Sequence, residues 1–106
     1  MKKVIWTPTA RKSLRQTSDF ITELWNEQAT NEFLNQLDYR ILQAQKNPEL
    51  APTFENSEFR QLLIHKSTSL FYQNFTDFIK LLLVWDNRQH PAELLDKLTD
   101  ADNSYE

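Results

Sequence analysis

Apolar residues in the first half of the chain recur at the spacing of α-helices, after a short extended segment. Residues 3–7 are rich in β-branched and aromatic side chains and predict a strand. Thr7-Pro8 then predicts a helix start, because threonine caps helices and proline fits the first helical position. The first helical stripe comprises Ala10, Leu14, Ile21, Leu24 and Trp25, and the second, between Asn26 and Asn47-Pro48, comprises Ala29, Phe33, Leu37, Ile41 and Ala44. Two amphipathic helices joined this closely predict an antiparallel hairpin.

The second half of the chain changes to the two-residue alternation of β-strands, after a proline-containing loop at 47–58. The three predicted strands are 59–65, 69–75 and 78–85. Their short connections require antiparallel hairpins, and the third strand is almost continuously apolar, so it should lie centrally in the sheet. The order β-α-α-β-β-β predicts an α+β fold, with a two-helix N-terminal hairpin packed on a mostly antiparallel four-stranded sheet. A final short helical piece is predicted at 92–98.

The 106 residues suffice for one small domain, and the charge pattern divides them into a body and a tail. The net charge is −3, and residues 99–106 contain three acidic residues and no basic one. The rest of the chain has 12 acidic and 12 basic residues, so it is neutral. We therefore predict a domain at 1–98 and an acidic flexible tail at 99–106. A neutral body lacks the basic excess that is typical of proteins binding nucleic acid through its phosphates.

Two residue types are missing from the sequence, and their absence excludes several kinds of chemistry. The chain has no cysteine, which excludes disulfides, thiol nucleophiles and cysteine-based metal sites. It also has no glycine, which nucleotide-binding loops and nucleophile elbows require. The two histidines, His65 and His90, are far apart in the sequence. We therefore expect neither a metal site nor a cofactor.

No segment of the sequence is apolar enough for a membrane helix. The longest uninterrupted apolar run is Leu81–Trp85, whereas a spanning helix needs ~20 residues. Charged side chains interrupt residues 1–30, which argues against a signal peptide. We expect a cytoplasmic protein with no membrane contact.

Segments at both ends of the chain resemble the RelE/ParE toxin family over roughly residues 3–95. They are Val4-Ile5-Trp6-Thr7-Pro8, Leu70-Phe71-Tyr72 and Leu83-Val84-Trp85-Asp86-Asn87-Arg88-Gln89. None of them is specific alone, and the resemblance rests on their order around two helices and an Asn-Pro loop. It implies the toxic half of a bacterial type II toxin–antitoxin pair, of the kind associated with plasmid stabilization. Each such toxin is held inactive by a small antitoxin that wraps it, so a toxin–antitoxin hetero-oligomer is expected.

The RelE-like branch of this family cuts messenger RNA in the ribosome, by attack of a 2′-hydroxyl on the neighbouring phosphodiester. That reaction needs proton transfer and cations that stabilise the transition-state charge. By resemblance, Arg60 and Arg88 match two of the four positions that supply these groups. The other two are not matched: Ser69 stands at or next to the middle-strand arginine, and residues 92–95 lack the C-terminal tyrosine. Tyr105 lies in the acidic tail and is a poor replacement.

The ParE-like branch lacks that catalytic set, and its characterised members inhibit DNA gyrase through protein contact. The two unmatched positions and the neutral body favour this branch, so we assign no catalytic residue with confidence. The expected partners are a cognate antitoxin and DNA gyrase. Two alternatives stay open: a RelE-like endoribonuclease that acts with the ribosome on mRNA, and a degenerate toxin that retains only antitoxin binding.

Two sets of residues are predicted to contact protein partners. The target-binding set is Arg60, Lys66 and Arg88, and the antitoxin-binding set is Arg11, Arg15, Phe20, Leu34 and Leu42. The apolar members fall off the main stripes of the helices, and the arginines could meet antitoxin carboxylates. The simpler alternatives are a solvated helix face for the basic cluster and a local turn pair between Asp86 and Arg88.

The remaining large aromatic residues are predicted to belong to the core. Tyr72 alternates with Leu70 and Asn74 on one strand face, which favours packing within the sheet. Trp6, Trp25 and Trp85 each end a strongly apolar stretch. All three tryptophans are therefore expected to be buried.

Overall fold

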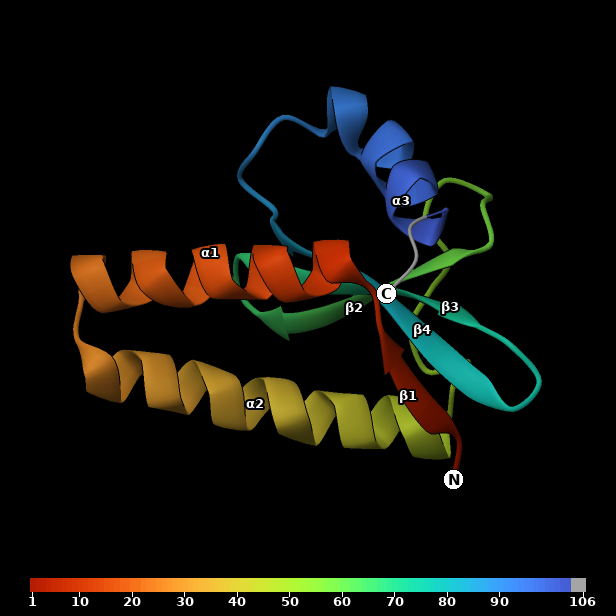
Figure 1. Cartoon of the computed structure of the whole chain (residues 1–106), viewed down its shortest axis with the longest axis horizontal. Helices are drawn as coiled ribbons and strands as arrows, with labels where there is room; N and C mark the ends of the chain where they lie inside the picture. Colours follow the sequence, from red (N-terminus) through yellow and green to blue (C-terminus); the bar gives the residue numbers. More distant parts are fainter. Residues whose placement is uncertain (104–106) are drawn as a thin grey trace.

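Helices and strands follow one another in the predicted order in the computed structural model, which describes residues 1–103 (Figure 1). The elements are β1 (Lys3–Trp6), α1 (Pro8–Leu24), α2 (Glu27–Lys46), β2 (Phe59–His65), β3 (Thr68–Asn74), β4 (Phe78–Asp86), the 3-10 helix η1 (Pro91–Glu93) and α3 (Leu94–Asp102). The predicted α+β fold is confirmed. None of the helices in this described part is long and apolar enough to span a membrane.

Both long helices begin at the residues that the sequence predicted as caps. The Thr7 hydroxyl accepts a hydrogen bond from the Ala10 N–H at 3.1 Å, and the Asn26 side chain accepts one from the Ala29 N–H at 2.8 Å. These bonds satisfy amide groups that have no partner within the first turn of a helix. The tight connection at Trp25 and Asn26 sets α1 and α2 antiparallel, as predicted.

The four strands form one mixed sheet in the order β1-β4-β3-β2. β4 is central, as its apolar sequence predicted, and it pairs parallel with β1 and antiparallel with β3. The antiparallel pairing of β2 with β3 completes the sheet. Because β1 has only four residues, it covers β4 only from Phe78 to Leu81. The rest of that edge of β4 needs other partners.

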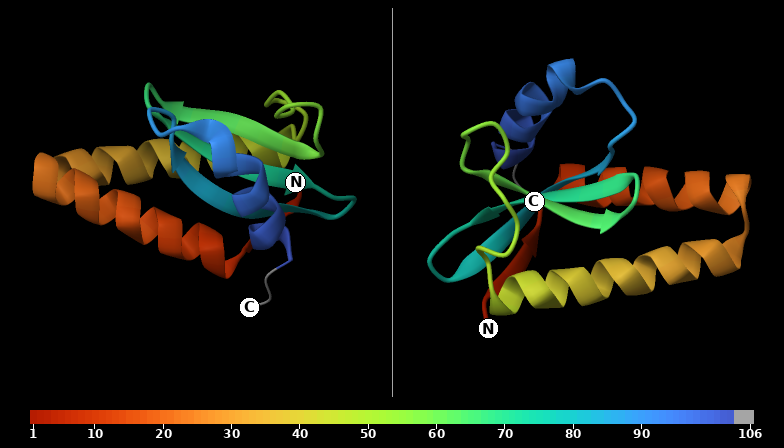
Figure 2. Two further views of the ribbon diagram at one scale, coloured as in Figure 1. Left: turned by 90° about the horizontal axis from the view of Figure 1, so that it is seen from above. Right: turned by 180° about the vertical axis from the view of Figure 1, so that it is seen from behind.

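Helices cover both faces of the sheet (Figure 2). On one face, α1 and α2 contribute Ala10, Phe33, Leu37, Ile41 and Ala44 to a cluster with Leu62, Leu70, Tyr72, Ile79, Leu81 and Val84. On the other face, α3 places Leu94, Leu98 and Ala101 against Phe59, Phe71, Leu83 and Trp85. The predicted burial of Tyr72 and Trp85 is confirmed, and Trp6 packs partly buried against the first cluster.

The hydroxyl of Tyr72 reaches out of the core to the loop between α2 and β2. It donates a hydrogen bond to the Pro48 carbonyl at 2.6 Å. Burial raises the pKa of Tyr72, because a charged phenolate is costly away from water. This contact ties the loop at 47–58 to the centre of the sheet.

The predicted burial of Leu24 and Trp25 was wrong. Their side chains are 57% and 71% exposed, because the closed end of the helical hairpin extends beyond the sheet (Figure 1). A helical stripe identifies the apolar face of a helix, but it does not show how far the partner surface extends along that face.

The predicted boundary between body and tail was also misplaced. α3 continues to Asp102, Ala101 is fully buried, and Lys80 of β4 forms an ion pair with Asp102 at 2.9 Å. Residues 99–102 therefore belong to the folded body. The rest of the predicted tail, with Tyr105, lies outside the described residues.

Candidate functional site: a groove beneath the helical hairpin

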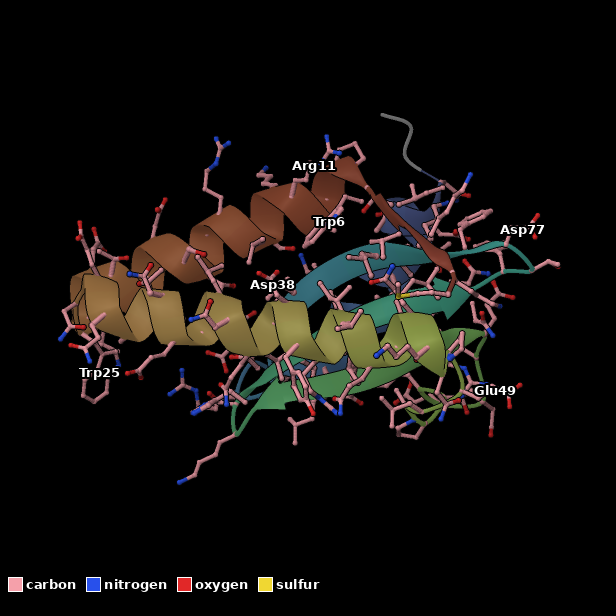
Figure 3. All side chains as sticks on the ribbon, turned by 90° about the horizontal axis from the view of Figure 1, so that it is seen from below. Trp6, Arg11, Trp25, Asp38, Glu49 and Asp77 are labelled. Atoms are coloured by element: carbon pink, nitrogen blue, oxygen red, sulfur yellow. The ribbon has the colours of Figure 1, made fainter. Side chains whose placement is uncertain are left out.

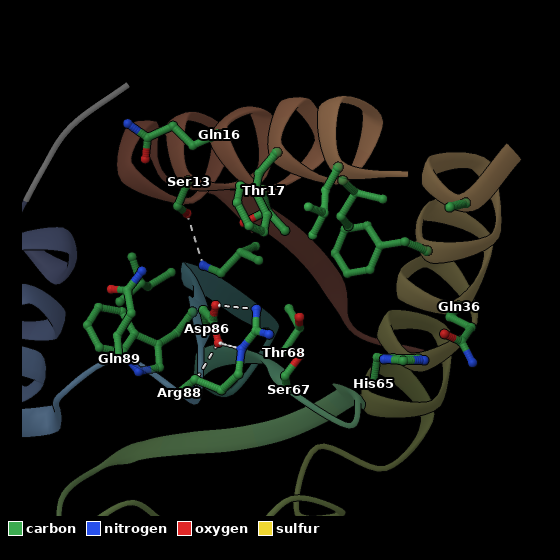
Figure 4. A pocket seen from close by; sticks show the side chains of 18 of the residues that line it. Ser13, Gln16, Thr17, Gln36, His65, Ser67, Thr68, Asp86, Arg88 and Gln89 are labelled. Carbon is green, nitrogen blue, oxygen red and sulfur yellow. Dashed lines mark hydrogen bonds and ion pairs between the residues drawn. The ribbon is translucent and has the colours of Figure 1, made fainter. Parts of the chain in front are cut away.

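A groove of about 780 Å³ opens between the helical hairpin and one end of the sheet (Figure 4). Its upper wall is formed by residues between 13 and 24 of α1, by Trp25 after the helix, and by residues between 29 and 36 of α2. Its floor is the end of β4, residues 83–86, with His65, Ser67 and Thr68 at and beside the β2–β3 turn. Arg88, Gln89 and Lys97 complete the rim.

The short β1 strand explains how this end of the molecule is built. Where β1 ends, the edge of β4 is hydrogen-bonded by α1 and its cap instead of by a strand. The Thr7 hydroxyl donates to the Leu81 carbonyl at 2.8 Å, and the Ser13 hydroxyl accepts from the Val84 N–H at 2.9 Å. The start of α1 is therefore fixed to the sheet, whereas its far end extends past the sheet (Figure 1) and forms one wall of the groove.

The hairpin wall of the groove carries large apolar side chains that are open to solvent. Phe20 is 50% exposed, and the still more exposed Leu24 and Trp25 follow it at the end of α1 and directly after it. Ala29 and Phe33 of α2 lie behind them along the same wall. Clustered exposed apolar side chains mark interaction sites on soluble proteins.

The opposite rim carries a bidentate ion pair between Asp86 and Arg88. The Arg88 guanidinium donates to the two carboxylate oxygens at 3.0 and 2.8 Å, and the Arg88 N–H donates at 2.9 Å. The side-chain hydrogen bonds from Arg88 lower the pKa of Asp86, and the carboxylate raises the pKa of Arg88. The simpler prediction of a turn pair is confirmed.

The two arginines that match RelE-like catalytic positions lie at opposite ends of the sheet. Arg60 is paired with Tyr72, whereas Arg88 follows Asp86, which pairs with Thr68 at the other end of β3. The Arg60 guanidinium donates to the Ala51 carbonyl at 2.7 Å, so it braces the loop before β2. Lys66, in the turn after β2, lies at the Arg88 end.

Ser69 of β3 is fully buried, and its hydroxyl accepts a hydrogen bond from the Gln61 side chain at 3.2 Å. The position that a RelE-like enzyme would use for a cation therefore holds a buried, bonded hydroxyl. Within residues 1–103, no three His, Asp or Glu side chains come together where they could hold a metal ion.

The predicted antitoxin-binding residues do not share one surface. Phe20 lines the groove, and Arg11 and Arg15 are exposed on the preceding turns of α1. Leu34 is partly buried against the core of the hairpin, so it is less available than predicted. Leu42 is exposed on α2, but it is not among the residues that line the groove.

Several groove residues were not predicted as site residues. Leu24 and Trp25 were assigned to the core, and Gln36, His65 and Lys97 were not assigned a role. One signal was present in the sequence: Glu23 and Glu27 flank Leu24 and Trp25, and acidic residues on both sides are unusual for a buried turn.

A solved structure shares this architecture. The chromosomal ParDE toxin–antitoxin system from P. aeruginosa matches with a TM-score of 0.69, over 81% of this chain and 96% of that chain. The sequence identity is 16%, so this likeness shows the fold alone: a small α+β domain.

The sequence itself identifies the family. The model of the ParE toxin of the type II toxin–antitoxin system parDE matches residues 4–91. This chain therefore belongs to the ParE toxin family, and the predicted resemblance and its ParE-like branch are confirmed. No curated protein matches the sequence.

Proposed function

We propose that this protein is a toxin that inhibits DNA gyrase by protein contact, and that a cognate antitoxin neutralises it by occupying the groove. Membership of the ParE toxin family is the observation that carries the proposal. The solved relative is a ParDE toxin–antitoxin system, which supports an antitoxin as the first partner. Both partners would be met in the cytoplasm, where gyrase acts.

The groove has the features of a site for a peptide segment of a partner protein. It joins an apolar wall at Phe20 to a floor of mixed apolar and polar residues, and its volume exceeds what a single side chain needs. Arg11 and Arg15 lie on the same helix as Phe20, towards its start. An acidic antitoxin segment could therefore place apolar side chains in the groove and carboxylates near these arginines.

The positions of the basic residues support inhibition by contact over RNA cleavage. A cleavage site needs cations and a proton donor around one phosphate. Here Arg60 braces a loop, Arg88 is paired with Asp86, and the two lie at opposite ends of the sheet. Lys66 and Arg88, which share one end, remain candidates for contacting the target protein.

Antitoxin binding can be tested with the product of the neighbouring gene. Calorimetric titration of the purified toxin should give saturable binding that weakens by about 10-fold or more in Phe20→Ser, because an exposed aromatic anchor is lost. Leu63→Ser, which changes an exposed apolar residue of β2 outside the groove, serves as the control. Equal affinity of the wild type and Phe20→Ser would exclude the groove as the antitoxin site.

The choice of target can be tested in cells that express the toxin. We expect plasmids to lose negative supercoils, while primer extension on abundant messages shows no new cuts within codons. Cuts within codons that Arg88→Ala abolishes, with unchanged plasmid topology, would establish the ribosome-dependent endoribonuclease instead.

A further inference from the structure

The closed end of the helical hairpin carries an apolar patch that the core does not use. The tip patch consists of Phe20, Leu24 and Trp25, which are half or more exposed. Trp25 lies at the far end of the hairpin, and Arg11 lies near the other end of α1 (Figure 3). Exposing three large apolar side chains together is costly in a free protein, and it favours a surface that a partner covers.

On the helical hairpin itself, the charged residues nearest the tip patch in the sequence are all acidic, whereas Arg88 and Lys97 come from other elements that line the same groove. Residues 16–39 contain five acidic residues and no lysine or arginine, whereas residues 1–15 contain five basic residues and no acidic one. The acidic residues are Asp19, Glu23, Glu27, Glu32 and Asp38, and all are exposed. The hairpin is therefore polarised along its length, with the apolar patch at its negative end.

We propose that the tip patch is the surface with which the toxin binds its target, and that it docks onto a positively charged protein surface with an apolar cleft. This inference rests on the proposed function. Negative charge next to an apolar patch attracts a basic protein surface and repels nucleic acid. An enzyme that holds DNA presents positive charge along its DNA path, and DNA gyrase is such an enzyme.

The same arrangement accounts for neutralisation by the antitoxin. Phe20, Leu24 and Trp25 belong to the tip patch and also line the groove. An antitoxin segment that fills the groove therefore covers part of the surface that the target needs. Toxin bound to antitoxin would be unable to present the tip patch to gyrase.

Binding of the toxin to immobilised gyrase holoenzyme tests the inference. Replacing Leu24 and Trp25 together by serine should weaken binding by about 30-fold or more, as expected for central aromatic anchors. Replacing Glu23 and Glu27 together by lysine should weaken binding by about 10-fold at low salt, and less at high salt because screening reduces the attraction.

Matched controls separate the tip from general effects of charge and polarity. Glu58→Lys with Asp77→Lys reverses two exposed acidic residues outside the hairpin, and Asp77 lies at the other end of the molecule from Trp25 (Figure 3). Leu95→Ser makes the same kind of change on α3. Both controls should bind gyrase like the wild type, and thermal unfolding establishes that each variant is folded.

The outcomes distinguish this inference from the proposed function. If the wild type neither binds gyrase nor inhibits it, both the proposed target and the inference about the tip patch are wrong. If the wild type binds but both tip variants bind equally well, the inference alone is wrong. The inference is also wrong if the Glu58/Asp77 control loses as much affinity as the tip charge variant. If the variant with serine at positions 24 and 25 does not fold, gyrase binding by the variant with lysine at positions 23 and 27 tests the inference.

Discussion

At the scale of single residues, Ser13 joins the helical hairpin to the sheet. Its hydroxyl accepts from the Val84 N–H and donates to the Ala10 carbonyl, and all three residues are buried. A buried amide that loses its partner costs about 1–3 kcal/mol. We therefore expect Ser13→Ala to lower the free energy of unfolding by that amount in urea denaturation.

Ser18→Ala is a suitable control for this measurement, because Ser18 lies on the same helix and is only partly buried. It should change the free energy of unfolding by less than about 0.5 kcal/mol. A Ser13→Ala protein as stable as the control would mean that water or a shifted strand satisfies Val84.

The ion pair at the groove rim gives a second prediction at this scale. Hydrogen bonds from Arg88 lower the pKa of Asp86, so the carboxylate stabilises the fold at pH values above its ordinary pKa of 3.8. That contribution is lost as the pH falls through the lowered pKa. We expect Arg88→Ala to raise the pKa of Asp86 towards 3.8, as followed by the carboxyl carbon signal in an NMR titration. An unchanged pKa would show that the pair does not persist in solution.

Residue contacts were predictable where they are local. Thr7 and Asn26 could be assigned as caps, because the groups they bind lie three residues away. The partners of Ser13 and Arg60 could not be assigned in this way. Val84 is 71 residues from Ser13, and the loop that Arg60 braces has no pattern that points to an arginine.

At the scale of elements, α3 is held to the sheet by an apolar face and by one ion pair at its end. Lys80 and Asp102 are only partly exposed, and the lysine also donates to the Asp102 carbonyl. We expect Asp102→Asn to destabilise the protein by roughly 1 kcal/mol and to speed hydrogen exchange in the last turn of α3. Asp100→Asn, on the same turn but exposed, should do neither. If exchange in α3 is the same in both variants, the ion pair does not hold the helix end.

The elements themselves were largely predictable from periodicity, and the exceptions have physical causes. Helices α1 and α2 begin directly after their predicted caps and end within one residue of the predicted position. Strands β2 to β4 begin and end within one residue of their predicted bounds. The exposure of Trp25 was not predicted, because an apolar helical stripe does not show how far the sheet extends along the helix. The last turn of α3 was missed because its acidic sequence conceals one small buried residue, Ala101.

At the scale of the whole molecule, the candidate site arises from elements that are distant in the sequence. Of the eight contact residues that the sequence predicted, Phe20 and Arg88 line the groove. The sequence could not predict the groove itself, because that depends on the short β1 and on how far the hairpin extends past β4. The sequence shows that basic residues lie at one end of the hairpin and acidic residues at the other. This separation indicates a docking surface only in combination with the exposure of Trp25, which the sequence did not predict.

The most direct test of the account is the supercoiling of relaxed plasmid by purified DNA gyrase. We expect the toxin to stop supercoiling in a concentration-dependent way, and we expect prior addition of the antitoxin to restore it. Messenger RNA in a translating extract should stay intact at the same toxin concentrations. Full gyrase activity at every concentration of a toxin that still binds its antitoxin would contradict the central claim.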